Sequence, residues 1–184
     1  MDIGERFIIG VDPATAKGKR KAIALVHFAP AQQPTVIHWC DEHITEAPIQ
    51  ERVNGFLNAV SDVIEWAKTH IGQVDLVAVE DAWARGRGGA NLQYLVQAIV
   101  ALAEQCGIRA HRVSPSTVKK DATGSGRASA PEVSATVRME YKGFEEIPAE
   151  QAGDLEAAAA VSGAGFRWLQ ETLLTEWLRR YKKR

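Results

Sequence analysis

An apolar segment that ends in an acidic residue constrains the fold of this chain more than any other feature. Phe7-Ile8-Ile9-Gly10-Val11 is followed directly by Asp12 and Pro13. Two isoleucines and a valine in so short a run predict a central strand that is covered on both faces. A carboxylate at the end of such a strand is costly unless it is hydrogen-bonded, paired with a cation or bound to a metal. Asp12 is therefore expected in a polar site; the alternative is that it starts an Asp-Pro turn just outside the core.

The rest of the chain alternates between strand and helix patterns. Further strands are predicted at 22–28, 35–40, 74–79 and 108–113, and helices at 49–72, 90–106, 131–141, 148–161 and from 166 to the C-terminus. The order βββαβαβ followed by helices predicts an α/β fold with a mixed central sheet flanked by helices. No repeat or linker divides the chain, so we expect one domain over 1–184, in which 166–184 forms an amphipathic helix with a basic tail.

Composition excludes several classes of protein. At 184 residues, 46% of them apolar and 24% charged, the chain is an ordinary globular protein that can bury a sizeable core. The N-terminal residues lack a signal-peptide pattern and no apolar run reaches the roughly 20 residues of a membrane span, so we expect a cytoplasmic protein. Cys40 and Cys106 stand outside any Cys/His ligand pattern, which argues against zinc and against a disulfide framework.

The net charge of −1 conceals an uneven distribution of charge. Basic residues gather at 17–21, 109–127 and 179–184, whereas acidic residues gather at 41–51 and 140–156. One basic run is usually a solvated face, but three of them favour a polyanionic partner.

Two predicted strands end in an acid, and a third acid lies on an alanine-rich helix. If the strands are neighbours, Asp12 and Glu80 meet at one sheet edge, and Asp154 can approach them from a helix that packs closely. Glu150 and Gln151 lie on the same helix face as Asp154. Such oxygen ligands suit Mg²⁺, and a two-ion site of this kind hydrolyses phosphodiesters. For Asp154 and Glu150 the alternative is that the helix dipole alone favours acids near a helix start.

Five motifs, in this order, resemble the RuvC family of Holliday junction resolvases over about residues 7–162. They are Ile8 to Pro13, Val77 to Glu80 with Trp83 three residues later, Val113 to Lys119, Thr123 to Ala128, and Gln151 to Asp154. The resemblance implies an RNase H-like fold and a homodimer. It also implies an endonuclease that makes paired nicks in a four-way DNA junction, with two Mg²⁺ or Mn²⁺ ions per site and no organic cofactor or membrane partner.

The resemblance also implies roles for individual residues. It makes Asp12, Glu80 and Asp154 metal ligands, with either Glu150 or Gln151 as the fourth, and it makes Lys119 the catalytic cation near the scissile phosphate. Asp81 and Glu156 are expected to point away from this site. The predicted DNA contacts come from two loops and one basic segment and comprise Trp83, Arg85, Arg87, Lys119, Lys120, Ser125 and Arg127. Trp83 could instead pack on the sheet, and the amides around Ser125 are expected to face a phosphate.

Two other functions stay open. One is a related nuclease of the same fold that acts on other branched DNA or on hybrids. The other is a non-catalytic module that binds DNA junctions, because Gln151 replaces the family's usual acid or His and Ala130 replaces its usual lysine.

Overall fold

The computed structural model describes residues 4–14, 21–40, 42–44, 46–81, 89–145, 147 and 149–181, with the side chains of 149–151 and 181 outside this description. Five strands form one mixed sheet in the order β3-β2-β1-β4-β5. β1, β2 and β3 pair in an antiparallel manner, while β4 lies parallel to β1 and β5 parallel to β4. The strands are β1 (Arg6–Asp12), β2 (Ala22–Phe28), β3 (Thr35–Cys40), β4 (Leu76–Glu80) and β5 (Arg109–Val113).

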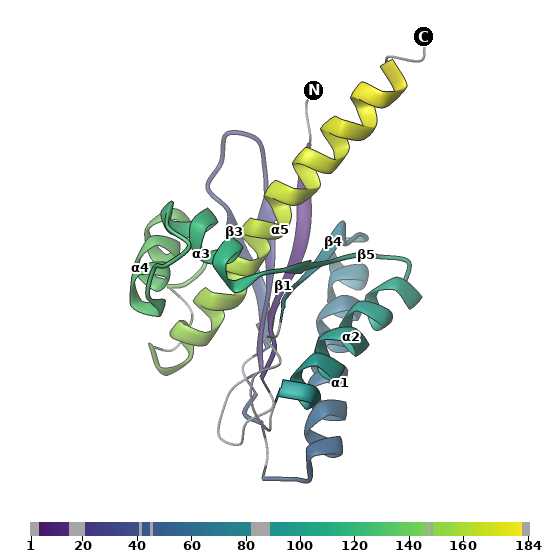
Figure 1. Cartoon of the computed structure of the whole chain (residues 1–184), viewed down its shortest axis with the longest axis vertical. Helices are drawn as coiled ribbons and strands as arrows, with labels where there is room; N and C mark the ends of the chain where they lie inside the picture. Colours follow the sequence, from purple (N-terminus) through teal and green to yellow (C-terminus); the bar gives the residue numbers. More distant parts are fainter. Residues whose placement is uncertain are drawn as a thin grey trace.

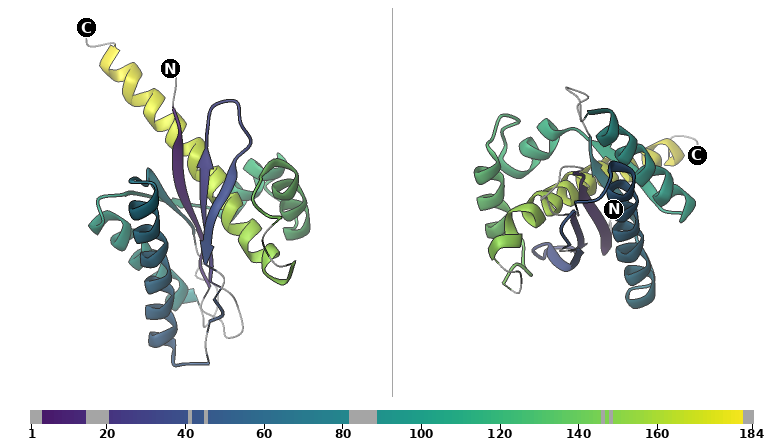
Figure 2. Two further views of the ribbon diagram at one scale, coloured as in Figure 1. Left: turned by 180° about the vertical axis from the view of Figure 1, so that it is seen from behind. Right: turned by 90° about the horizontal axis from the view of Figure 1, so that it is seen from below.

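Helices cover both faces of this sheet (Figures 1 and 2). α1 (Ile49–His70) and α2 (Gly89–Gln105) lie on one face, and α3 (Pro115–Thr123), α4 (Ala130–Glu140) and α5 (Ala149–Tyr181) lie on the other. The residues of β1 alternate between the two cores: Ile9 and Val11 pack in the α1/α2 core, whereas Ile8 packs in the α5 core. Burial on both faces explains the nearly unbroken apolar sequence of the strand.

Gly10 lets α5 lie directly on β1. A Cβ atom at Gly10 would stand 2.0 Å from the Ala158 carbonyl oxygen, so no larger residue fits without moving the helix. Gly165 has the same role further along α5, where a Cβ would stand 2.5 Å from the Cβ of Ala78 on β4. These two contacts fix the path of α5 across the sheet and bring its first turns to the carboxyl ends of β1 and β4.

The predicted α/β architecture is confirmed, with two differences among the helices. The structure has α3 at a position where the sequence predicted only a basic segment: Ser114 caps it, accepting a hydrogen bond from the Thr117 amide at 3.2 Å, and Pro115 is its first residue. The predicted break between 161 and 166 is wrong, because α5 continues unbroken through it. Glycine in a helix costs about 1 kcal/mol relative to alanine, and the close packing of Gly165 on β4 offsets that cost.

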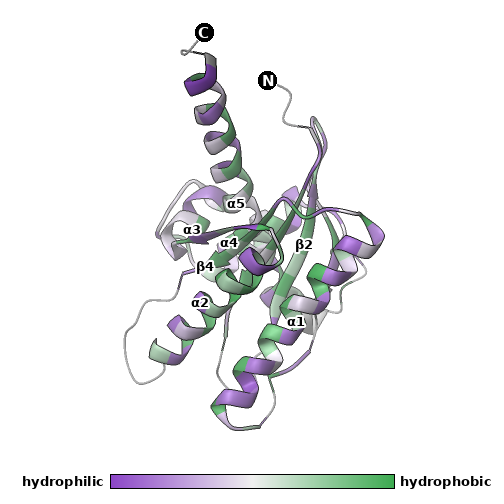
Figure 3. Cartoon of the chain, turned by 90° about the vertical axis from the view of Figure 1, so that its right-hand side faces the viewer, coloured by the Kyte–Doolittle hydropathy of each residue, from purple (hydrophilic) through white to green (hydrophobic). Residues whose placement is uncertain are grey.

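The last turns of α5 extend past the rest of the molecule (Figures 1 and 3). Leu169 is buried and Leu173 packs on the core, whereas Leu174, Trp177 and Leu178 remain 48%, 47% and 43% exposed. The broad apolar face predicted for 166–184 is therefore only partly core. None of the described helices combines the length and apolarity needed to cross a bilayer.

Candidate active site

Asp12 and Glu80 occupy adjacent positions at the carboxyl edge of the sheet. β1 and β4 are parallel and their last paired residues are Val11 and Val79, so the next residue of each strand is the acid. Side chains alternate between the faces of a strand. Ile8 and Gly10 on β1, and Leu76 and Ala78 on β4, face α5, so both acids face α5 as well.

The electrostatics of Glu80 reflect this crowding. The pKa of Glu80 is raised from its ordinary value of 4.5 to about 7, chiefly by burial and then by the neighbouring Asp12 carboxylate, while Lys119 opposes both effects. Two carboxylates in this position repel one another unless a cation relieves them. The donor set therefore fits a hard divalent cation, which prefers oxygen ligands and needs only a few carboxylates.

A pocket of about 220 Å³ opens beside the two acids. Its walls come from three helices, of which α3 and α4 contribute their first turns and α5 contributes its fifth and ninth residues. The lining consists of Asp12, Glu80, Pro115, Val118, Lys119, Ala130, Val133, Ser134, Gly153 and Ala157. Helix N-termini carry partial positive charge, so the starts of α3 and α4 at this pocket favour an anion there. Carboxylates for a cation and helix ends for an anion are the combination that a metal-bound phosphate requires.

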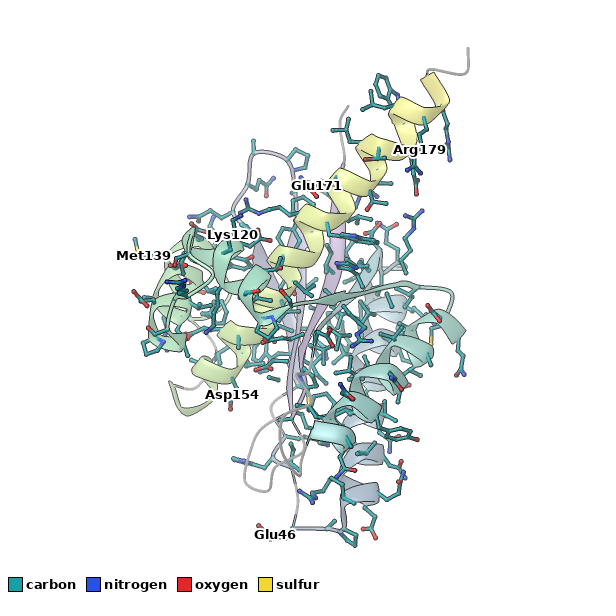
Figure 4. The ribbon with its side chains drawn as sticks, in the orientation of Figure 1. Glu46, Lys120, Met139, Asp154, Glu171 and Arg179 are labelled. Atoms are coloured by element: carbon teal, nitrogen blue, oxygen red, sulfur yellow. The ribbon has the colours of Figure 1, made fainter. Side chains whose placement is uncertain are left out.

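Asp154 lies at the margin of this pocket and not in its lining. Gly153 and Ala157 of α5 line the pocket, and Asp154 follows Gly153 near the start of the helix (Figure 4). Within the described residues, no group of three or more acidic, His or Cys side chains stands close enough to hold a metal. The side chains of Glu150 and Gln151 lie outside that description, so the predicted ligands from α5 remain predictions.

The two acids expected to point away do so. Asp81 accepts a hydrogen bond from Arg112 Nε at 3.1 Å on the outer surface. Glu156 is only 1% exposed and pairs with Arg138 of α4. Each acid therefore pairs with an arginine away from the pocket, in agreement with the alternation of side chains in a strand and the periodicity of a helix.

The basic residues of α3 separate into two groups. Lys119 lines the acid pocket, while Lys120 lies exposed on α3, well away from Asp154 (Figure 4). Lys119 is therefore the cation of this segment that can reach a phosphate bound beside Asp12 and Glu80.

Two of the three amides that the sequence suggested would face a phosphate, those of Gly124 and Ser125, are used within the turn after α3. The Gly124 amide donates to the Lys120 carbonyl at 2.8 Å and the Ser125 amide to Thr123 Oγ1 at 3.2 Å. The Ser125 hydroxyl itself accepts from the Arg127 amide at 3.3 Å. These groups hold the turn that leads into α4, so DNA contacts by Ser125 and Arg127 would use their side chains. Trp83, Arg85 and Arg87 lie outside the described residues.

Of the α4 wall of the pocket, the sequence analysis named only Ala130, and Val133 and Ser134 were missed. Ala130, Val133 and Ser134 are three and four residues apart on a helix that a Ser129/Glu132 capping box begins. That spacing identifies one helix face, but the sequence does not indicate that the face meets Asp12 and Glu80.

Comparisons with known proteins agree with this geometry. No family model matches the chain. The curated RuvC crossover junction endodeoxyribonucleases of Mycobacterium ulcerans and Mycobacterium marinum are each 29% identical to it over 134 residues, which cover 71% of this chain and 68% of the relative. Among solved structures, Thermus thermophilus RuvC in complex with a Holliday junction substrate matches with a TM-score of 0.65 and 22% identity, over 85% of this chain and 92% of that one. A second Thermus thermophilus RuvC structure matches with a TM-score of 0.64 over 88% and 96%. At 22% identity the solved structures establish the fold that the two chains share.

Proposed function

We infer that the chain is a member of the RuvC family, and we propose that it is a Holliday junction resolvase, an endodeoxyribonuclease that cuts DNA where four arms meet. The observation that carries the proposal is the adjacent pair Asp12 and Glu80 at the ends of parallel strands, in a pocket that also holds Lys119. The curated relatives carry the name of this activity, and the sheet matches that of a protein solved with its junction.

Each polar residue of the pocket has a separate role in the proposed cleavage of a phosphodiester. Asp12 and Glu80 would hold the metal, with Asp154 and either Glu150 or Gln151 completing its ligands from α5. Divalent ions bound in this way activate water and stabilise the leaving oxygen. Lys119 balances the charge of the phosphate, and the first turns of α3 and α4 attract that phosphate. We propose Mg²⁺ or Mn²⁺ as the ion, with two ions per site.

Symmetric cutting requires two sites. Two like phosphates on opposite arms call for a two-fold arrangement, so we propose a homodimer. Trp83, Arg85 and Arg87 follow Glu80 directly in the sequence, and we propose that they contact the DNA at the junction. We also propose a cytoplasmic location, which a DNA substrate supports.

One observation favours a second candidate, a non-catalytic module that binds junctions. Within the described residues the three predicted acids do not form a ready cation site. Cleavage of the junction distinguishes the resolvase from the non-catalytic module, whereas both would bind the junction.

The decisive experiment is cleavage of a synthetic four-way junction beside a linear duplex of the same sequence, in Mg²⁺ or Mn²⁺. We expect paired nicks in the junction alone, and their loss on chelation of the metal. Asp12→Asn should abolish cutting and leave junction binding intact. Asp62→Asn, the same change at an exposed position on α1, is the matched control and should cut normally.

Each other outcome points to a different function. A fully active Asp12→Asn variant contradicts the assignment of the site. Junction binding without cutting in either metal supports the non-catalytic module. Equal cutting of flapped DNA or of an RNA–DNA hybrid supports the related nuclease of the same fold.

A further inference from the structure

Ser134 is the polar residue that α4 contributes to the acid pocket. It stands four residues after Ala130 and one after the buried Val133, and all three line the pocket with Asp12, Glu80 and Lys119. Among the lining side chains of the pocket, the acids accept hydrogen bonds, whereas Lys119 and Ser134 donate them.

The Ser134 hydroxyl is not used within the fold. Helical hydroxyls commonly donate back to the carbonyl four residues earlier. Among the described residues, four hydroxyls do so: Thr123, Thr136, Ser162 and Thr175. Thr136 on the same helix donates to the Glu132 carbonyl at 3.0 Å. In the part of the chain that the structure describes, Ser134 makes no such bond and has no other hydrogen-bond partner. Its donor is therefore available to whatever enters the pocket.

We propose that the Ser134 hydroxyl donates a hydrogen bond to a non-bridging oxygen of the phosphate that is cut. This inference rests on the proposed function and adds a substrate contact to it. The first turns of α3 and α4 already favour an anion at this place. A neutral donor on α4 then holds one phosphate oxygen while Lys119 on α3 supplies the charge. The hydroxyl fixes the orientation of the phosphate through geometry, whereas the lysine attracts it from a distance.

The two contacts should differ in their dependence on salt. A cation that meets a phosphate releases counterions, so Lys119→Ala should reduce the slope of log affinity against log salt by about one. A hydroxyl releases none, so Ser134→Ala should leave that slope unchanged. It should slow single-turnover nicking at least about tenfold, the factor expected for a lost hydrogen bond to a charged group.

The test uses the full chain and compares wild type with variants of α4. Ser134→Ala and Ser134→Cys should both cut slowly, and Ser134→Thr, which keeps the hydroxyl, should cut close to the wild-type rate. Thr136→Ala removes a hydroxyl from the same helix but outside the pocket lining, and should leave the rate unchanged. Junction affinity, measured with Ca²⁺ in place of Mg²⁺, should change less than twofold in all four variants.

A second measurement keeps this inference separate from the proposed function. Calorimetric titration with inorganic phosphate in Mg²⁺ should show weaker binding to Ser134→Ala than to wild type or Thr136→Ala, whether or not the chain cuts DNA. If the wild-type chain cuts no junction, the proposed function is overturned, and the phosphate titration still tests the contact made by Ser134. Equal phosphate affinity in Ser134→Ala and wild type overturns the phosphate contact, as does an unchanged nicking rate.

Discussion

The stability of the metal-free protein should fall as the pH rises through neutrality, because Glu80 must then ionise next to Asp12. Its pKa lies at about 7 in the fold against an ordinary 4.5, chiefly through burial and then through the Asp12 charge. An acid whose pKa is raised on folding contributes stability that is full below pH 4.5 and lost as the pH passes 7. At about 1.4 kcal/mol per pKa unit, the loss approaches about 3 kcal/mol by pH 8.

Replacement of Glu80 by glutamine should remove this dependence, since the amide keeps the shape of the side chain without its charge. In EDTA, the free energy of unfolding from urea titrations should be similar for Glu80→Gln and wild type at pH 5. At pH 8 the variant should be more stable by about 2 to 3 kcal/mol. Saturating Mg²⁺ should restore stability to the wild type at pH 8 but much less to the variant, because a ligand that binds only the folded state stabilises it. If wild type and Glu80→Gln differ in free energy of unfolding by the same amount at pH 5 and pH 8, the assigned environment of Glu80 is refuted.

Two further predictions concern the packing of the sheet. Gly10→Ala should destabilise the protein by about 3 kcal/mol, because its Cβ would collide with the Ala158 carbonyl of α5. The control Gly55→Ala on α1, where a Cβ meets only Lys21 Nζ at 3.8 Å, should instead stabilise the protein by up to about 1 kcal/mol. Equal urea midpoints for the two variants would contradict the close approach of α5. His111 stacks on Trp168 with ring centroids 4.0 Å apart, and burial lowers its pKa. The contribution of His111 to the stability of the fold is therefore present above pH 6.5 and lost as the pH falls. In thermal melting, wild type should lose more stability than His111→Gln between pH 7 and pH 5. Equal losses would show that the stacked ring does not titrate differently in the fold.

The local sequence pattern was enough to predict most of the helices and strands and the two acids of the site that end strands, Asp12 and Glu80. The apolar run before Asp12 and the run before Glu80 are strands because both faces are covered, and their acids are the residues that directly follow the buried positions. The strands 22–28 and 35–40 were predicted with the bounds the structure has. By contrast, Ser114-Pro115 is a helix start at a position where only a basic segment was predicted, and a break was predicted between 161 and 166, where α5 continues.

The helices around the pocket were decided by tertiary packing. Gly10 and Gly165 have no side chain to signal a partner, yet they fix α5 on β1 and β4 because only a missing Cβ leaves room for its backbone. That path places Gly153 and Ala157 in the pocket and Asp154 at its margin.

The sequence by itself therefore determined that Asp12 and Glu80 each end a buried strand, since alternation and apolar burial are local properties of a strand. Only the tertiary structure decided that these two strands are neighbours and that Ser134 lines the pocket beside the acids. Helix periodicity says which residues share a face, but the partner of that face depends on how helices far apart in the chain pack against the sheet.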